Sequence, residues 1–268
     1  MCYELDLKNP KTLNEKIQWL KIYDSTSLKT KYADKYLVRK HIKETIGEKY
    51  LIPLIAVYDK ADDINFDILP DQFVIKCNHG SGYVIIVRNK EELNKEETIQ
   101  KLNSWMNINY AFTYGLELHY KNIKPKILIE EYIENEKQEK INDLAKNSGL
   151  YSYSFYCFNY KVNFIYIYKG AGNEIKANCY DINLNLLPFR IKRENLEKDY
   201  NPPKEEIKKM IKLSEKLAKD FIFVRVDWFL LNNKDIKFSE LTFTPFSGVI
   251  EFIPKEWDLK LGEVLKLN

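Results

Sequence analysis

The sequence predicts an α+β fold in two lobes that follows an N-terminal helical region. Its 268 residues suit one large domain or two lobes. Its shares of hydrophobic residues (45%) and charged residues (30%) are those of a globular protein and exclude disorder and coiled coil. Segments with helical spacing are mixed with short strand-type runs, which is typical of α+β proteins. We expect one structural unit, with a helical region (1–68), a small lobe (69–133) and a large lobe (134–268).

The helices are expected in four places along the chain. Thr12 and Glu15 form a capping box ahead of Ile17, Leu20 and Tyr23, which recur at helical spacing. The other three helices are predicted over residues 32–50 with a stop at Gly47, over residues 91–119, and after Asn201 and Pro202 with apolar residues between 207 and 218.

The strands are expected between and after these helices. Strand-type runs cover residues 54–58, 73–77, 83–87, 126–133, 154–158 and 163–168. The last run is a hairpin, in which FIFVRVDWFLL and IKFSELTF flank a turn at NNKD.

Charge, hydropathy and cysteine content exclude several classes of protein. The formal net charge is +3 with both signs interleaved, so no nucleic-acid or membrane footprint is indicated. The apolar run YLIPLIAVY is too short to cross a bilayer, and the first residues carry no signal-peptide pattern. Cysteines lie far apart without a CxxC spacing, which predicts reduced thiols in a cytoplasmic protein; they are Cys2, Cys77, Cys157 and Cys179.

The last hairpin is the segment most informative about chemistry. Strand alternation places Arg225 and Asp227 on one face, and a tight turn centred on residues 233 and 234 sets Asp227 opposite Glu240 and Arg225 opposite Thr242. Carboxylates about 5 Å apart repel each other, so a cation is expected between them. Oxygen ligands alone favour Mg²⁺ or Mn²⁺ over zinc. An exposed strand face, or a register slipped by one or two residues, is the alternative.

A glycine-rich turn follows the strand that carries Lys76. The segment FVIKCNHGSGYVIIV places His79 at the end of the strand, with Gly80, Ser81 and Gly82 in the turn. Such a loop exposes backbone N–H groups that can cover phosphates, with a nearby ammonium group neutralising their charge. A plain hairpin turn is the alternative, since neither of the two best-known phosphate-binding motifs is present.

The run KILIEEYI ends in Glu130 and Glu131, followed by Tyr132 and Ile133. It can offer backbone groups and an apolar wall to an adenine, or it is an ordinary strand end. The three histidines lie far apart without metal-ligand spacing, which argues against zinc. No serine sits in a GxSxG motif.

Taken in order, these segments resemble the ATP-grasp superfamily, and within it the subfamily named for teichuronopeptide biosynthesis (TupA-like). The resemblance rests on LNEKIQWLKIYD, DKYLVRKHI, YLIPLIAVYD, LPDQFVIKCNHGSG, ILIEEYI, FYCFNYK, FVRVDWFLLNN and ELTFTPFSG. It implies two α+β lobes that clamp ATP, and an enzyme that activates a carboxylate as an acyl phosphate for attack by an amine.

The resemblance also implies roles for residues. Lys35 and Lys76 are expected to contact the ATP phosphates beneath the HGSG loop, with His79 as a loop contact or proton shuttle. The interlobe hinge is expected to read adenine and ribose through Glu130, Glu131, Tyr132, Ile133 and either Glu134 or Glu136. Arg225 is expected near the acyl phosphate, and the Mg²⁺ ligands are expected to be Asp227, Glu240 and Thr242.

Two positions depart from the family pattern. Most relatives carry Asn as a third metal ligand where this chain has Thr242. The subfamily tends to read DYKFYCF where this chain reads SYSFYCF, so Ser154 takes the place of a basic residue near the nucleotide.

The function implied is a cytoplasmic ATP-dependent carboxylate–amine ligase. Its acid is expected to be a uronic acid or a nucleotide sugar acid, in capsule or cell-surface polysaccharide biosynthesis, with a glycosyltransferase as partner domain or protein. The alternatives are a nucleotide-binding module without turnover in a polysaccharide assembly complex, and a sugar kinase.

Overall fold

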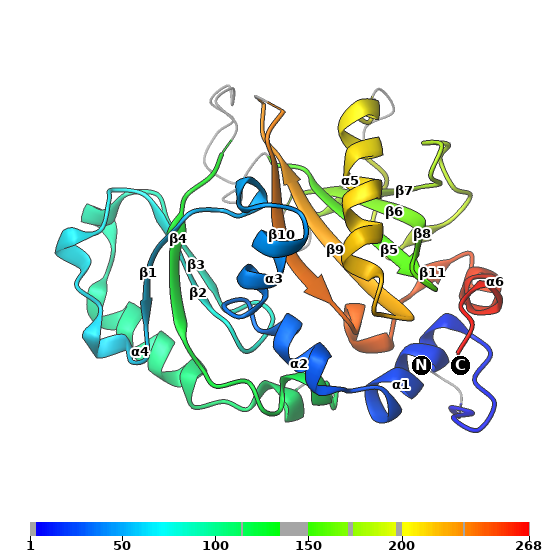
Figure 1. Ribbon diagram of the computed structural model, residues 1–268, viewed down its shortest axis with the longest axis horizontal. Coiled ribbons are helices and arrows are strands. Elements are labelled where there is room, and N and C mark those ends of the chain that lie inside the picture. The colour runs from blue at the N-terminus through cyan, green and yellow to red at the C-terminus, as the bar shows by residue number, and fades with distance from the viewer. Residues whose placement is uncertain are drawn as a thin grey trace.

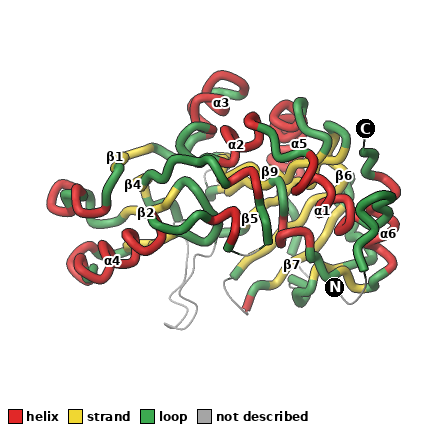
Figure 2. Tube along the Cα trace, turned by 90° about the horizontal axis from the view of Figure 1, so that it is seen from below, coloured by secondary structure: helices red, strands yellow, loops and turns green. Residues whose placement is uncertain are grey.

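The computed structural model describes residues 4–113, 115–134, 150–170, 174–196, 200–232 and 234–267. Its frame consists of two antiparallel sheets, with N-terminal helices between them in the view of Figure 1. The α+β class is therefore confirmed. Seen from below, both ends of the chain lie beside the larger sheet (Figure 2).

The smaller sheet has four strands in the order β1-β4-β2-β3. They are β1 (Leu54–Tyr58), β2 (Phe73–Cys77), β3 (Val84–Val87) and β4 (Ile127–Glu131). Although β1 lies in the segment 1–68 expected to be helical, it joins this sheet by pairing with β4. Alternation buries Phe73 and Ile75 on the face that packs near α4 (Lys95–Met106), and leaves Lys76 on the opposite face.

The larger sheet has five strands in the order β10-β9-β5-β6-β7. They are β5 (Ser152–Phe158), β6 (Lys161–Lys169), β7 (Lys176–Tyr180), β9 (Phe223–Leu230) and β10 (Ile236–Thr242). Helix α5 (Lys204–Ala218) covers one face with its predicted apolar residues, and Ser214 on it accepts a 2.9 Å hydrogen bond from the Trp228 indole. The other face carries Arg225 and Asp227. Two-residue strands β8 (Arg190–Ile191) and β11 (Phe252–Ile253) pair separately.

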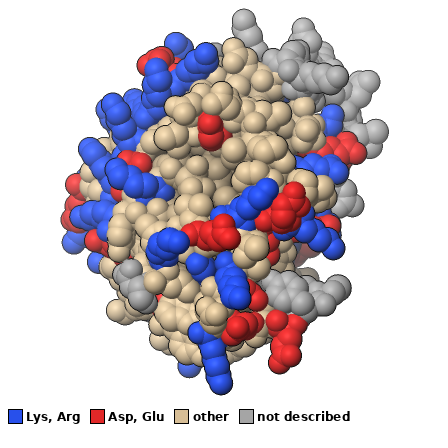
Figure 3. Space-filling view, turned by 90° about the vertical axis from the view of Figure 1, so that its right-hand side faces the viewer, with Lys and Arg blue, Asp and Glu red and all other residues tan. Residues whose placement is uncertain are grey.

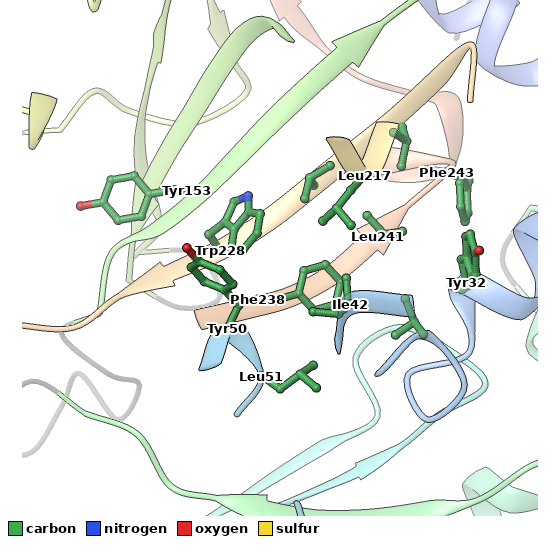
Figure 4. Close-up of a cluster of buried hydrophobic side chains, with 14 of the residues drawn as sticks. Tyr32, Ile42, Tyr50, Leu51, Tyr153, Leu217, Trp228, Phe238, Leu241 and Phe243 are labelled. Carbon is green, nitrogen blue, oxygen red and sulfur yellow. The ribbon is translucent and has the colours of Figure 1, made fainter. Parts of the chain in front are cut away.

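The N-terminal helices anchor the hairpin β9–β10. They are α1 (Leu13–Tyr23), α2 (Ser27–Ala33) and α3 (Val38–Thr45), followed by the 3₁₀ turn η1 (Glu48–Tyr50). Figure 4 shows Ile42 and Tyr50 beside Trp228, Phe238 and Leu241, all of them buried. The segment that follows Lys35 is therefore fixed to the strands that carry Arg225 and Glu240, and α2, which precedes Lys35, also contacts β10.

The C-terminal helix α6 (Glu256–Val264) packs against α1. Asn14 joins the two by donating to the Ile250 carbonyl (2.8 Å) and to Asp258 Oδ2 (2.9 Å). Gly262 permits this contact, because a Cβ there would lie 2.1 Å from the Lys11 carbonyl oxygen. Neither α6 nor β7 was expected from the sequence.

The remaining short elements are 3₁₀ turns. They are η2 (Ala61–Asp63), η3 (Phe66–Ile68), η4 (Lys90–Glu92), η5 (Tyr110–Phe112), η6 (Leu118–Tyr120) and η8 (Pro245–Gly248).

Several local predictions are confirmed. The Thr12–Glu15 capping box forms as predicted, with both reciprocal hydrogen bonds. Gly47 follows the end of α3 with φ of +111°, a conformation that favours glycine. Cys77, Cys157 and Cys179 are buried free thiols, as expected, while Cys2 lies outside the described residues.

Three helix predictions are wrong in part. The helix predicted over 32–50 is broken at residues 34–37, because the Asp34 carboxylate accepts the N–H groups of Tyr36 and Leu37. The helix predicted over 91–119 ends at Met106 and continues as η5 and η6. Tyr23, expected on the buried face of the first helix, is 62% exposed.

The surface carries both signs of charge. In Figure 3, Lys and Arg side chains are interspersed with Asp and Glu among uncharged residues, in agreement with the interleaved sequence. In the described ranges, none of the helices is long and apolar enough to span a bilayer.

Candidate functional site

The hairpin β9–β10 brings together the four side chains predicted from its register. Asp227 pairs with Glu240 and Arg225 pairs with Thr242, as the sequence predicts. The single uniform register is wrong nearer the turn, where Trp228 pairs with Phe238, one residue out of step. A β-bulge between Phe238 and Glu240 absorbs this difference. The bulge thus restores the pairing of the two carboxylates.

Arg225 lies between these carboxylates and is the cation that the repulsion argument requires. Its Nη2 is 2.6 Å from Asp227 Oδ2 and 3.6 Å from Glu240 Oε1. Its Nε donates to Asp227 Oδ1 at 2.9 Å, and Nη2 also donates to Thr242 Oγ1 at 3.1 Å. The Thr242 hydroxyl lies 3.2 Å from Asp227 Oδ2 and 3.1 Å from Glu240 Oε1. The repulsion between the carboxylates therefore does not by itself require a metal ion, because a side chain of the same hairpin lies between them.

Burial and charge act differently on the two carboxyl groups. Burial raises the pKa of Asp227, although Arg225 acts in the opposite direction. Burial also acts to raise the pKa of Glu240, but the charges of Lys35 and Arg225 lower it below its ordinary value. For Arg225, burial acts to lower the pKa and the charge of Asp227 raises it well above the ordinary value.

Lys35 connects the two sheets. It lies in the break between α2 and α3, where its own N–H donates to the Asn78 carbonyl at 3.3 Å. Its Nζ donates to the Gly80 carbonyl at 2.7 Å and lies 3.4 Å from Glu240 Oε2. The break that the sequence did not predict is thus what directs Lys35 toward both the glycine loop and the hairpin.

Lys76 takes part in a second ionic cluster, on the smaller sheet. Its Nζ donates to Glu130 Oε2 at 2.6 Å, and Arg39 Nη1 donates to Glu130 Oε1 at 2.9 Å. Arg39 also donates to the Ile52 carbonyl at 2.7 Å. Glu130 is buried and holds both cations in place. Arg39 was not identified from the sequence, where nothing in its spacing distinguishes it from a surface arginine.

The glycine loop between β2 and β3 is fixed by aromatic residues. Gly82 has φ of +77°, and a Cβ at Gly80 would lie 2.8 Å from ring atoms of Tyr83 and Tyr110. Ser81 between them is exposed. Both glycines are therefore required by the backbone, one for its conformation and one for close approach.

His79 is buried beneath this loop. Its Nε2 lies 3.0 Å from the Trp105 carbonyl oxygen at the end of α4, so this nitrogen is the donor. Burial lowers the pKa of His79, which keeps the ring neutral at physiological pH. The geometry is that of a loop anchor, not of a group exposed to reacting atoms.

The segment expected to form the hinge leaves β4 at Glu131. Glu131 is exposed and its N–H donates to the Pro53 carbonyl at 3.0 Å. Arg88 Nε donates to the Tyr132 hydroxyl at 3.1 Å. Ile133 is half-buried and Glu134 is exposed. Glu136 lies outside the described residues.

The donor set of the hairpin fits Mg²⁺. No group of three or more His, Cys, Asp or Glu side chains is arranged to hold a metal among the residues that the structure describes. Asp227, Glu240 and Thr242 offer oxygen atoms alone, and Mg²⁺ is commonly bound by one or two carboxylates while it keeps several waters. Ser154 on β5 is fully buried and pairs with Asp227 on β9. The position where this chain departs from the family pattern is therefore directly beside the residue that carries this carboxylate.

The ionic clusters on the two sheets, with Lys35 between the glycine loop and Glu240, form the kind of site expected from the resemblance to ATP-grasp proteins. The chain belongs to the TupA-like ATP-grasp family, whose family model matches residues 15–266.

Solved structures with a similar fold are more distant. An ATP complex of D-alanine–D-alanine ligase from Bacillus anthracis is 17% identical with a TM-score of 0.49, covering 87% of this chain and 66% of that one. An L-amino acid ligase from Bacillus licheniformis is 15% identical with a TM-score of 0.48, covering 84% and 46%. This chain thus spans less than two thirds of either structure. No match is found among curated protein sequences.

Proposed function

We propose that this protein is an ATP-dependent carboxylate–amine ligase that forms an amide through an acyl phosphate. Membership of the TupA-like ATP-grasp family supports this proposal, together with an ionic site between two sheets. The same proposal includes the expected lobes, a small lobe over residues 69–133 and a large lobe over residues 134–268. It adds β1 to the small lobe, because β1 pairs with β4.

The observation that carries the proposal is the position of Lys35. One ammonium group contacts both the glycine loop, at the Gly80 carbonyl, and the carboxylate pair, at Glu240. A polyphosphate requires backbone N–H groups and fixed cations on one side and a route to a divalent cation on the other. Lys35 is where these two requirements meet.

Each predicted residue has a role in this proposal. Lys35 and Lys76 hold the phosphates, and the loop of Gly80, Ser81 and Gly82 covers them. The segment from Glu130 to Glu134 holds the nucleoside, with Glu130 orienting Lys76. His79 positions the loop from below and does not touch the reacting atoms.

On the larger sheet, Arg225 holds the transferred phosphoryl group and the acyl phosphate. Asp227, Glu240 and Thr242 hold Mg²⁺. When bound, Mg²⁺ supplies charge neutralisation for phosphoryl transfer. The chain itself supplies orientation and fixed positive charge, which commonly account for most of phosphoryl-transfer catalysis.

The substrate class and cellular role are the finer part of the proposal. The acid is a uronic acid or nucleotide sugar acid. The reaction takes place in the cytoplasm, and its product is used in capsule or cell-surface polysaccharide biosynthesis. A glycosyltransferase is the proposed partner.

Turnover with defined substrates tests the function. The protein is mixed with ATP, Mg²⁺ and a panel of uronic acids, with and without amines, and ADP and products are measured. ADP that requires both acid and amine identifies a ligase, and a stable phosphorylated sugar identifies a kinase. Hydroxylamine in place of the amine should yield a hydroxamate if an acyl phosphate forms. ADP production without any hydroxamate across the panel would contradict the proposal.

One observation favours the non-catalytic module as a second candidate. Arg225 already occupies the position between the two carboxylates, so the site is neutralised in part without a metal. A module of this kind would bind nucleotide without Mg²⁺ and without turnover. Calorimetric titration with a non-hydrolysable ATP analogue, with and without Mg²⁺, separates the candidates, because a ligase should bind the analogue more tightly with Mg²⁺.

A further inference from the structure

A buried carboxylate with unused hydrogen-bond acceptor positions lies near the site formed by Arg225, Asp227 and Glu240. Glu117 precedes η6 and is 8% exposed. Its carboxylate accepts the hydroxyl of Thr244 and also interacts with the hydroxyl of Ser247. A carboxylate has about four acceptor positions, so two hydroxyl donors leave it incompletely satisfied. Among the residues that the structure describes, Glu117 forms no salt bridge, although the charge of Lys21 acts on it from nearby. Buried carboxylates are ordinarily paired.

The nearby Lys21 does not fill this gap. Its ammonium group has three N–H donors, and all three are used on other oxygens. They go to Gln18 Oε1 (3.1 Å), the Ser247 carbonyl (3.0 Å) and Ser247 Oγ (3.1 Å). Lys21 therefore fixes the turn that presents Ser247 to Glu117, and leaves the carboxylate open to a cation from outside the chain.

The backbone around Glu117 is held in uncommon conformations. Phe246 and Ser247 have φ of +51° and +54°, and Leu116 on the facing segment has φ of +54°. These values lie in the left-handed region, which residues other than glycine seldom adopt. Such residues cluster at functional sites, where the surrounding structure holds them in place. The two segments touch, because a Cβ at Gly115 would lie 2.3 Å from Ser247 Oγ.

The position of Glu117 relates it to the proposed acyl phosphate. Thr244, whose hydroxyl donates to the Glu117 carboxylate, lies two residues beyond the end of β10, the strand that carries Glu240 and Thr242. The charge of Glu240 acts to raise the pKa of Glu117. Figure 1 shows α1 beside the orange-red turn that follows β10, and α1 contacts both η8 and η6.

The rim of this site is apolar. Leu116 and Phe246 are both exposed, and each is next in sequence to a residue that forms the site. A buried anionic group beneath an apolar rim suits a small organic cation better than a hydrated metal ion.

We propose that Glu117 binds the ammonium group of the amine substrate and removes its proton before attack. This inference rests on the proposed ligase function. The proton passes from the substrate R–NH₃⁺ to the Glu117 carboxylate and leaves R–NH₂. The nitrogen lone pair then forms the C–N bond to the acyl carbon, and the C–O bond to phosphate breaks, its electron pair leaving with inorganic phosphate. The departing phosphate takes up the second proton of the nitrogen, which leaves a neutral amide.

Burial raises the pKa of Glu117, which makes it a stronger base than an exposed glutamate. Lys21 from α1 and the hydroxyls of Thr244 and Ser247 act to lower this pKa, and Glu240 from β10 acts to raise it. His119 and Tyr120 follow on the same segment; burial lowers the pKa of His119 and raises that of Tyr120, so both are uncharged at neutral pH.

The test compares two nucleophiles with the same acid. Hydroxylamine is largely uncharged at neutral pH and needs no base, whereas ammonium chloride, glycine and glucosamine are offered mainly with a protonated, cationic nitrogen. Wild-type protein, Glu117→Gln and the exposed control Glu263→Gln are supplied with ATP, Mg²⁺ and each uronic acid. Glu117→Gln should lower amide formation by about 10²-fold or more and leave hydroxamate formation within about threefold of wild type. Glu263→Gln should leave both unchanged.

Three outcomes would overturn the assignment or its basis. Equal loss of amide and hydroxamate in a folded Glu117→Gln protein would mean that Glu117 serves acid activation or structure. If wild-type protein forms hydroxamate but accepts none of the amines with a protonated nitrogen, the proposal that Glu117 binds an ammonium group would be wrong. No hydroxamate from wild-type protein with any acid would contradict the ligase function itself, and this inference with it.

A milder variant covers the case in which Glu117→Gln does not fold. Ser247→Ala removes one hydroxyl that stabilises the ionised carboxylate, so the pKa of Glu117 should rise. The acidic limb of the pH–rate profile should then move to higher pH for the cationic amines and remain in place for hydroxylamine. Identical profiles for wild type and Ser247→Ala with both nucleophiles would overturn the proposal.

Discussion

The ionic clusters on the two sheets have opposite compositions. On the smaller sheet, one carboxylate, Glu130, is shared by two cations, Lys76 and Arg39. On the larger sheet, one cation, Arg225, is shared by two carboxylates, Asp227 and Glu240. The first cluster has an excess positive charge. The second has an excess negative charge by itself, which Lys35, 3.4 Å from Glu240, offsets from outside the larger sheet. A polyphosphate complements the first and a divalent cation the second, which is the division of labour that the proposed function requires.

The difference also concerns what each cluster does for stability. Removing Lys76 leaves Glu130 paired with Arg39, whereas removing the charge of Asp227 leaves Arg225 with one ionic contact in the hairpin, at 3.6 Å to Glu240. The cluster on the larger sheet should therefore be the more sensitive to mutation. The predictions below test this contrast.

The largest effect is expected from Asp227→Asn. Breaking a buried ion pair by removing one partner costs about 3–5 kcal/mol, and the shape-preserving amide should place the loss near the lower limit. Turnover of ATP should be abolished, and the added stability from Mg²⁺ with an ATP analogue should disappear, because a ligand stabilises only the state that it binds. Thermal unfolding with and without these ligands measures both effects. The exposed control Asp220→Asn should behave as wild type, and an Asp227→Asn protein as stable as wild type would show that Arg225 does not depend on Asp227.

Lys76→Ala should lower activity strongly and stability little. Loss of one preorganised charge contact commonly reduces the rate by about 10²–10³-fold. Since Arg39 remains on Glu130, the free energy of unfolding should fall by about 1 kcal/mol or less. ADP release and urea unfolding give the two values, with Lys212→Ala on the exposed side of α5 as the control. Activity within tenfold of wild type would remove Lys76 from the phosphate site.

Acid should destabilise the protein through its buried histidines. Burial lowers the pKa of His119 to about 3, so the folded state keeps this ring neutral while the unfolded state takes up a proton below about pH 6.5. Stability should therefore fall by about 1.4 kcal/mol per pH unit for His119 alone as the pH decreases from about 6.5 toward 3. His79 and His41, whose pKa values burial also lowers, act in the same direction.

Urea unfolding between pH 7 and pH 4 measures this slope. His119→Phe should reduce it, since the substituted ring takes up no proton in either state. An unchanged slope in His119→Phe would mean that His119 is protonated in the folded protein.

The smallest effect is expected from an exposed ion pair. Lys43 Nζ lies 2.7 Å from Glu48 Oε2, as close as the ionic contacts in the two buried clusters, but both side chains are more than half exposed. Lys43→Ala should change the free energy of unfolding by about 0.5 kcal/mol or less. A loss as large as that of Asp227→Asn would show that burial is not what separates the clusters from surface pairs.

Local features were predictable from the sequence to the extent that neighbouring residues decide them. The Thr12–Glu15 capping box depends on contacts within one helical turn, and the pairing of Asp227 with Glu240 depends on a short turn between two adjacent strands. The bulge between Phe238 and Glu240 was not predictable, because no residue type in the hairpin requires it. The predicted strand register of the hairpin was therefore right at Asp227 and Glu240 and wrong nearer the turn.

The sequence by itself determined the α+β class, the hairpin carboxylates, the glycine loop and the family. Each of these follows from residue types at short spacing or from the order of motifs along the chain. Only the tertiary structure decided where Lys35 reaches, which carboxylate Arg39 pairs with, and that Lys21, Glu117 and Ser247 meet. These contacts join residues more than 40 positions apart, and they form because burial of apolar surface fixes the helices and the two sheets relative to one another. Side-chain chemistry at short range can be read from a sequence, whereas a partner brought from a distant segment is decided by packing.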